Sequence, residues 1–269
     1  MGLALLLGLL LLAGLSVYFF TANGWWLPAA ASSAAHAVDA QFFRSYLVMG
    51  IVFVVAQVAL GVFVWKYSRG KRSSEPAVYS HGHNGLELAW TILTAILFLG
   101  LQASGHPIWA SERFEGSPQN AVQVEATGVQ FAWYFRYPGP DGKFGTTSPK
   151  LIDASLGGES ALGLDPDDAA AKDDVVTGEM YLPVDRDVDL SLHAQDVIHS
   201  FFVPNMRFKQ DAVPGLRIHV KLHPDVIGVY EIACAELCGL GHYKMHAKLH
   251  VVSQAEFDAW IAAKVMEKQ

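Results

Sequence analysis

The chain has 269 residues, a formal net charge of −7 and a mean hydropathy of +0.25, with 52% hydrophobic and 17% charged residues. It is too apolar for an ordinary water-soluble protein and too charged to lie wholly in lipid. We therefore expect a split architecture, with helices in membrane lipid and a water-exposed domain, and no nucleic-acid partner.

Three stretches without Asp, Glu, Lys or Arg are long enough to cross a bilayer, since about 20 helical residues span the hydrocarbon core. They are Leu3–Phe20, Ser45–Trp65 and Leu88–Ser111. The second and third predict a transmembrane hairpin within residues 38–110. The positive-inside rule places the link between them in the cytoplasm, because it contains Lys66, Arg69, Lys71 and Arg72. The chain after about Gly105 is then expected on the outer side.

The first apolar stretch has two interpretations. Residues 1–37 are either a signal peptide, with Ala35-His36-Ala37 as an A-x-A-like cleavage site, or a retained third span followed by a linker. No basic residue precedes the apolar run, and the gap between that run and the alanines is long for a signal peptide. Both interpretations remain open.

Residues 111–257 read as an exported β domain. Short alternating or β-branched runs punctuated by Gly, Pro and Asp predict an antiparallel sandwich or barrel. The runs are Ala121–Glu125, Gln130–Tyr137, Val175–Leu182, Val188–Leu192, Ile218–Leu222, Gly228–Cys234 and Lys248–Val252. A short helix over Asp258–Val265, within residues 258–269, is predicted to end the chain.

Acidic residues dominate the exported part. From residue 104 onward there are 23 Asp and Glu against 14 Lys and Arg. Such a surface suits a basic soluble partner, which it would attract over a distance. Residues 138–177 are rich in Gly, Pro and Asp and predict an insertion over the surface. Its acidic cluster, Asp165, Asp167, Asp168, Asp173 and Asp174, is interpreted as solvated surface.

The chemistry lies in a C-terminal motif that reads Cys234-Ala-Glu236-Leu-Cys238-Gly-Leu-Gly-His242-Tyr-Lys-Met245, together with His199 at a distant strand end. Thiolate, thioether and imidazole ligands favour copper. A mononuclear blue-copper site needs only one Cys, so the second one indicates two metals. If both sulfurs bridge, each copper can take one His. Met245 and the carbonyl of Glu236 then complete the two sites.

This motif resembles that of subunit II of haem–copper cytochrome c oxidases, in which it holds the binuclear CuA centre. The resemblance covers roughly Arg44 to Phe257. It implies a transmembrane hairpin followed by a cupredoxin-like Greek-key domain, in a multi-pass protein of the bacterial inner membrane. It also implies that the chain itself reduces no oxygen, and that its partners include subunit I and other oxidase subunits. The implied ligands are His199, Cys234, Glu236 (carbonyl), Cys238, His242 and Met245.

The resemblance suggests roles for further residues. Phe131, where the family commonly has Trp, and Trp133 mark the point where electrons enter, and Asp196 helps to dock the donor. The side chain of Glu236 is implied as a ligand of Mg²⁺ or Mn²⁺ at the boundary with subunit I, with Asp211 nearby. Glu87 marks the mouth of the K proton pathway, although a Glu at a helix start also complements the helix dipole.

The function expected from the resemblance is that of the subunit through which electrons enter an aa3-type terminal oxidase. Cytochrome c, or a membrane-bound cytochrome, reduces CuA, and the electrons pass to haem a in subunit I. Oxygen reduction to water and proton pumping occur in the complex. Two alternatives remain: the CuA subunit of a nitric oxide reductase, and a membrane-tethered copper carrier.

Overall fold

The computed structural model describes residues 2–22, 27–68, 79, 81–113 and 116–268. It divides into two compact units. The first comprises residues 1–26 and 39–107, and the second comprises residues 27–38 and 108–269.

The first unit is helical. Its helices are α1 (Gly2–Ala22), α2 (Ser33–Ser68) and α3 (Asn84–Arg113). The first residues of α2 and the last residues of α3 belong to the second unit. All three are long and apolar enough to cross a membrane. Of the basic residues in the predicted cytoplasmic link, Lys66 lies in the last turn of α2, whereas Arg69, Lys71 and Arg72 lie outside the described residues.

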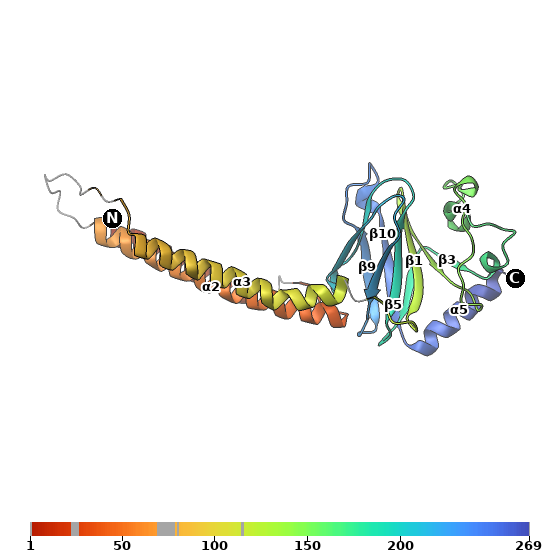
Figure 1. Cartoon of the computed structure of the whole chain (residues 1–269), viewed down its shortest axis with the longest axis horizontal. Helices are drawn as coiled ribbons and strands as arrows, with labels where there is room; N and C mark the ends of the chain where they lie inside the picture. Colours follow the sequence, from red (N-terminus) through yellow and green to blue (C-terminus); the bar gives the residue numbers. More distant parts are fainter. Residues whose placement is uncertain (1, 23–26, 69–78, 80, 114–115, 269) are drawn as a thin grey trace. The chain divides into compact units, whose positions relative to one another are not determined.

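The predicted hairpin is formed by α2 and α3, which run side by side (Figure 1). Side-chain hydrogen bonds join them within the apolar unit. The amide Nε2 of Gln41 donates to the carbonyl of Leu101 at 3.1 Å, and the hydroxyl of Ser104 donates to Oε1 of Gln41 at 3.1 Å. Because the alternative in lipid is an unpaired amide, these bonds help fix the register of the pair.

The second unit is a β-sandwich. One sheet has the strand order β3-β2-β1-β5-β8 and the other β4-β10-β9-β6-β7. The two sheets stack face to face, and helix α5 (Gln254–Lys268) lies beside their edge strands β3 and β4 (Figure 1). The strand bounds are Val122–Val129 (β1), Ala132–Tyr137 (β2), Val175–Thr177 (β3), Met180–Pro183 (β4), Val188–Ala194 (β5), His199–Val203 (β6), Phe208–Ala212 (β7), Ile218–Leu222 (β8), Gly228–Cys234 (β9) and His246–Val252 (β10).

The core forms where alternating side chains of the two sheets meet. In β5, for example, Val188, Leu190 and Leu192 are fully buried, whereas the intervening polar residues face away from the core. Phe201 of β6 packs edge-to-face against Trp133 of β2 at 5.5 Å between ring centroids. This aromatic contact joins the sheets directly beside the start of β6.

Several details differ from the sequence predictions. The single strand expected over Val175–Leu182 is two strands, because the chain turns at Gly178 and passes from one sheet to the other. Two strand pairs are parallel rather than antiparallel, β1 with β5 and β4 with β10. Strand β7 was not predicted, and the terminal helix α5 runs over Gln254–Lys268.

The predicted insertion contains short helices rather than only loop. They are η1 (Pro149–Leu151), α4 (Gly158–Leu162) and η2 (Ala170–Lys172). A buried ion cluster ties the insertion to the first sheet. Arg136 of β2 donates from Nε to Glu125 of β1 at 2.7 Å and from Nη1 to Asp174 at 3.1 Å. All three side chains are almost fully buried, so each charge depends on the others. The interpretation of the acidic cluster as solvated surface is therefore wrong for Asp174, which is buried against Arg136.

Candidate metal centre

Three adjacent segments of the second sheet place the predicted ligands. His199 is the first residue of β6, and Cys234 is the last residue of β9. These strands pair antiparallel, with Phe201 opposite Cys234. The connection from β9 to β10, residues 235–245, is called the copper loop here. It contains Cys238, the short helix η4 (His242–Lys244) and Met245.

The copper loop is closed at its base. The N–H of Cys234 donates to the carbonyl of Met245 at 3.0 Å, and the N–H of Met245 donates to the carbonyl of His242 at 3.1 Å. The loop therefore leaves and re-enters the sheet at neighbouring points. Its two ends are fixed by β9 and β10, which pair antiparallel from Gly228 with Val251 to Ala233 with His246.

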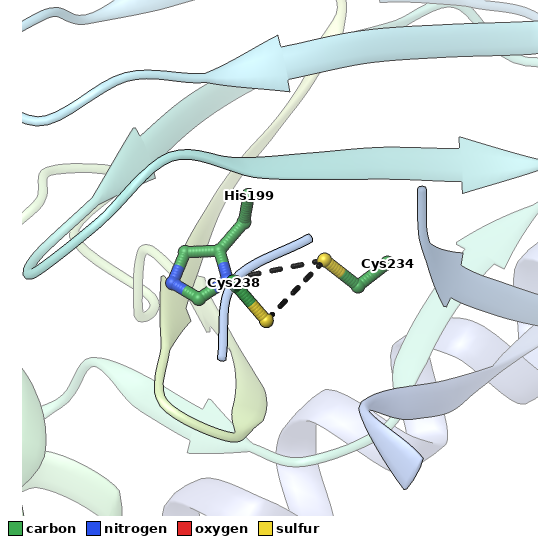
Figure 2. Close-up of side chains that lie close together, drawn as sticks. All are labelled: His199, Cys234 and Cys238. Carbon is green, nitrogen blue, oxygen red and sulfur yellow. Dashed lines mark hydrogen bonds between the residues drawn. The ribbon is translucent and has the colours of Figure 1, made fainter. Parts of the chain in front are cut away.

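The predicted ligand atoms converge around the two thiols. The sulfurs of Cys234 and Cys238 lie 3.9 Å apart. Around Cys234 lie the His199 Nδ1 at 3.9 Å and the Glu236 carbonyl oxygen at 3.2 Å. The Cys238 sulfur lies 3.7 Å from both the His242 Nδ1 and the Met245 Sδ. Figure 2 shows His199, Cys234 and Cys238 directed toward one another.

The donor set fits a copper centre. The cysteines are free thiols, and among the described residues His199, Cys234 and Cys238 form a buried cluster able to hold a metal ion. Burial of the Cys238 thiol and the nearness of Cys234 raise the pKa of Cys238 to about 11. A metal must therefore displace its proton. Two sulfurs shared by two imidazoles, a thioether and a carbonyl match the ligand preferences of copper.

The imidazole of His199 is enclosed on the side away from the thiols. Its Nε2 lies 2.8 Å from Oδ1 of Asp196. Burial alone would raise the pKa of Asp196, but hydrogen bonds from His199 and from the main-chain N–H groups of Gln130 and Val197 hold it below its ordinary value. Asp196 is therefore an ionised acceptor beside a candidate ligand.

Phe131 and Trp133, the two aromatic residues predicted to receive electrons, differ in their depth beneath the surface. Trp133 is almost fully buried, and its ring lies edge-on to His199 at 5.9 Å between centroids. Phe131 is partly buried in the turn before β2 and packs on the copper loop at Gly239 and Gly241. Trp133 thus belongs to the core beneath the site, and Phe131 lies nearer the surface.

The acidic residues predicted to have roles, Glu236, Asp211 and Glu87, do not gather at one place as the predicted copper ligands do. The side chain of Glu236 is exposed, with its carbonyl at the Cys234 sulfur. Asp211 accepts hydrogen bonds from Ser200 at 2.7 Å and from Lys209 at 2.9 Å. Glu87 lies in the first turn of α3 and is exposed. Asp211 connects to the site through Ser200, which follows His199 in β6.

Sequence reasoning did not single out two residues that hold the site. Gly128 of β1 backs the His199 ring, since a Cβ there would lie 2.7 Å from its Cδ2. Gln130 donates its side-chain amide to the carbonyl of Cys238. A glycine in a strand signals a close approach, and this signal was available at Gly128. No such signal marks Gln130.

Comparison with known proteins agrees with the motif. Residues 122–252 match the family model for the periplasmic domain of cytochrome c oxidase subunit II, and residues 21–104 match the model for its transmembrane domain. The alternative cytochrome c oxidase subunit 2 of Bradyrhizobium diazoefficiens is 34% identical over 262 residues, which cover 96% of this chain and 91% of that protein. The chain belongs to the cytochrome c oxidase subunit II family.

The chain is also similar to other proteins at lower identity. Cytochrome c oxidase subunit 2 of Cereibacter sphaeroides is 28% identical over 240 residues, covering 86% of this chain and 77% of that protein. The crystal structure of the periplasmic domain of subunit II of a Bradyrhizobium japonicum cytochrome oxidase covers 57% of this chain and 99% of that domain. It has 27% identity and a TM-score of 0.41.

Membership confirms the predicted family and the predicted fold, in which apolar helices precede a cupredoxin-like periplasmic domain. The chain is the electron-transfer subunit of a haem–copper oxidase, which is an oxidoreductase complex. Subunit II proteins normally bind CuA, and the cluster of His199 with the two cysteines is able to hold a metal.

Proposed function

We propose that this subunit II is the point where electrons enter an aa3-type terminal oxidase. It takes electrons from cytochrome c and delivers them to haem a in subunit I of a multi-pass complex in a bacterial inner membrane. The complex reduces oxygen to water and pumps protons. One observation carries the proposal. At the end of one sheet the two cysteine sulfurs lie 3.9 Å apart, and two imidazole nitrogens and the thioether sulfur each lie less than 4 Å from one of them.

The proposed copper ligands divide into two groups that share the sulfurs. Cys234 and Cys238 would supply thiolates to both halves of the centre. His199 and the Glu236 carbonyl lie on the Cys234 side, and His242 and Met245 lie on the Cys238 side. A copper pair bound there would supply one-electron redox chemistry. The chain contributes a rigid, dry ligand frame, since His199, Cys238 and Met245 are each at most 3% exposed.

The donor is proposed to dock on the copper-loop face. Three apolar side chains of this loop are largely exposed, namely Leu237, Leu240 and Tyr243. Clustered exposed apolar residues mark interaction sites in soluble domains. Phe131 packs beneath the loop and Trp133 contacts His199, which supports electron entry along this aromatic pair. Asp196, at the same face, is the proposed docking acid.

Two further proposals concern subunit I. The exposed carboxylate of Glu236 would hold Mg²⁺ or Mn²⁺ at that boundary, with Asp211 nearby, because hard cations take carboxylate oxygens. Glu87 would open the K proton pathway, and its place in the first turn of an apolar helix supports this role. An ionisable residue at a membrane boundary is a functional candidate.

Oxygen is the proposed electron acceptor of the complex, rather than nitric oxide. The relatives described above are named cytochrome c oxidase subunit 2, including the one at 34% identity. A copper carrier is disfavoured because the ligand set continues past the two cysteines to His242, Met245 and His199.

The test is electron transfer in the assembled complex. Reduced cytochrome c is mixed with the purified oxidase while oxidation of the cytochrome and consumption of oxygen are followed. The proposal expects rapid oxidation in the wild type and loss of it in Cys238→Ser. Rapid cytochrome oxidation by a Cys238→Ser complex would refute the route through this subunit.

A further inference from the structure

Asp196 uses both carboxylate oxygens inside the protein. Oδ1 lies 2.8 Å from Nε2 of His199 and accepts the N–H of Val197 at 2.7 Å. Oδ2 accepts the N–H of Gln130 at 2.7 Å. Gln130 begins the turn between β1 and β2, so this one acid connects the His199 ligand to that turn.

The same turn holds the copper loop. The side-chain amide of Gln130 donates to the carbonyl of Cys238. The ring of Phe131 covers the backbone of the two loop glycines, since a Cβ at Gly239 would lie 3.1 Å from its Cε1, and one at Gly241 would also collide with the ring. Gly239 also has φ +136, a conformation that other residues rarely adopt.

The His199 ring has little freedom to rotate. Gly128 lies against one face, and Trp133 lies edge-on at 5.9 Å between centroids. With Nε2 on Asp196, Nδ1 points to the Cys234 sulfur at 3.9 Å. The bond to the carboxylate selects the ring nitrogen that carries the proton, and so leaves Nδ1 free to bind a metal.

We propose that Asp196 and the Gln130–Phe131 turn form one clamp that positions both ligand-bearing segments of the copper centre. This proposal rests on the proposed function. Asp196 and the turn are positioning residues: Asp196 orients His199, and the turn fixes Cys238 and the glycines beside it. The ligands would then be held in place before copper arrives, and the site would rearrange little between oxidation states.

The first variant is Asp196→Asn, which keeps the shape and removes the charge. Loss of such an outer partner typically weakens metal binding about 10–100-fold. The reduction potential should rise, because an imidazole hydrogen-bonded to a carboxylate donates more electron density and favours oxidised copper. Phe131→Ala should speed copper loss without that rise, since it frees the loop but leaves the His199 bond intact.

The matched control is Asp189→Asn. Asp189 also pairs with a histidine, His219 at 3.3 Å, but on β5 and β8 away from the ligands. Full-length protein in detergent is loaded with copper, and its dissociation to a chelator, its EPR spectrum and its potential are measured. A wild type without a two-copper spectrum would overturn the proposed function. If the wild type shows a two-copper spectrum but Asp196→Asn and Phe131→Ala match Asp189→Asn in copper dissociation, EPR spectrum and potential, the clamp is overturned and the proposed function is not.

A second, independent inference concerns residues 28–33, called the strap, which connect α1 to α2. The strap is part of the β unit. The N–H of Ala31 donates to the carbonyl of Asn205 at 2.9 Å, and the N–H of Ser33 donates to that of His223 at 3.3 Å. Asp225 donates its N–H to the carbonyl of Ala31 at 3.3 Å. The strap therefore pairs with two separate loops of the domain.

Side chains and burial reinforce this attachment. Asn205 donates its amide to the carbonyl of Ala29 at 2.8 Å. The hydroxyl of Ser32 donates to the carbonyl of Met206 at 3.3 Å and accepts the N–H of Ala35 at 3.1 Å, which caps α2. Ala31 and Ala35 are fully buried. Ala35 is the first alanine of the A-x-A pattern, and it lies inside a capped helix rather than in an accessible extended segment.

Helix α1 is packed on α2 within the helical unit. Leu6 lies directly against Gly61, where a Cβ would come within 2.6 Å of Leu6 Cδ1. At the other end, Phe20 and Tyr46 pack edge-to-face at 5.7 Å. The early residue of α1, Leu6, contacts the later residue of α2, Gly61, and the late residue of α1, Phe20, contacts the earlier residue of α2, Tyr46. The two helices are therefore antiparallel. The family model for the transmembrane domain begins at residue 21, so it does not include most of α1.

We infer that residues 1–37 are retained in the mature subunit and that α1 is a third span with its N-terminus in the cytoplasm. Cleavage after Ala37 or Ala31 would remove a segment that the exported domain uses. The subunit is purified from native membranes through a C-terminal tag, and its N-terminus is sequenced. A chain that begins at Met1 or Gly2 supports the inference, whereas one that begins at Ser32 or Val38 overturns it.

The role of the strap is tested by replacing residues 28–33 with a Gly/Ser linker of equal length. The exported domain should unfold at a lower temperature, while the same replacement of exposed residues 151–156 should have a smaller effect. Equal unfolding temperatures for the wild type and the strap variant would show that the strap does not belong to the domain.

Discussion

The sulfur atoms of Cys234 and Cys238 lie 3.9 Å apart as free thiols, one at the end of β9 and the other four residues on in the copper loop. The distance is well beyond the roughly 2 Å of a disulfide bond. It suits two sulfurs that face a shared metal. Each sulfur also has its own imidazole at less than 4 Å, so neither cysteine duplicates the other.

Replacing either cysteine by serine should abolish the binuclear centre. Cys234→Ser removes the sulfur beside His199 and the Glu236 carbonyl. Cys238→Ser removes the sulfur beside His242 and Met245. The near-infrared band and the two-copper EPR pattern are the measurements. A Cys234→Ser protein with an unaltered near-infrared band would contradict the ligand assignment.

Met245→Leu should keep copper and shift the reduction potential. A long thioether ligand contributes little to affinity but tunes the potential of copper sites. The matched control is Met180→Leu, since Met180 is equally buried but lies in β4 within the core. Complete loss of copper from Met245→Leu, with normal loading of Met180→Leu, would mean that Met245 is a principal ligand.

Glu87→Gln should slow turnover of the assembled oxidase at the step of proton uptake. If Glu87 only complements the dipole of α3, its loss costs at most about 1 kcal/mol of stability and leaves the rate unchanged. Glu87→Asp, which keeps the charge at the helix start, is the companion variant. Normal turnover of a fully assembled Glu87→Gln complex would leave this residue with a helix-start role only.

Asp174 should give the exported domain a pH-dependent stability. Burial raises the pKa of Asp174 to about 6, although the N–H of Gly145 and the Arg136 guanidinium favour its ionised form. The ordinary value is 3.8. Between these values the folded state binds more protons than the unfolded state, so the contribution of Asp174 to the unfolding free energy falls as the pH rises.

The measurement is the unfolding midpoint of full-length protein in detergent at several pH values from about 4 to 7. Asp174→Asn should remove the fall in stability across this window, because the amide does not titrate. Asp167→Asn, an exposed acid of the same insertion, serves as the control. A pH dependence that is the same in Asp174→Asn and wild type would contradict this origin.

Much of the site was predictable because its ligands are close in sequence. Cys234 directly precedes the copper loop, which contains Cys238, His242 and Met245. Their chemical types specify copper without knowledge of the fold. His199 lies 35 residues before Cys234, so the sequence offered it as a second imidazole without showing that it reaches the loop. The pairing of β6 with β9 explains its position. The alternating run of β5 likewise predicted a strand with one buried face.

The parts that could not be predicted depend on contacts between distant segments. Gln130 reaches Cys238 across 108 positions, and Asn205 reaches the strap at Ala29 across 176. Neither residue type signals such a contact in the sequence. The division of Val175–Leu182 into β3 and β4 depends on which neighbour each half pairs with, and the alternation pattern of a single strand does not contain that information.

The most direct test of the central claim is the copper stoichiometry and EPR spectrum of the full-length subunit, purified in detergent and loaded with copper. The ligand geometry predicts two coppers per chain and a hyperfine pattern from one electron shared by two nuclei. One copper per chain with the pattern of a single nucleus, or Cu(I) that passes readily to a chelator, would contradict the electron-transfer centre.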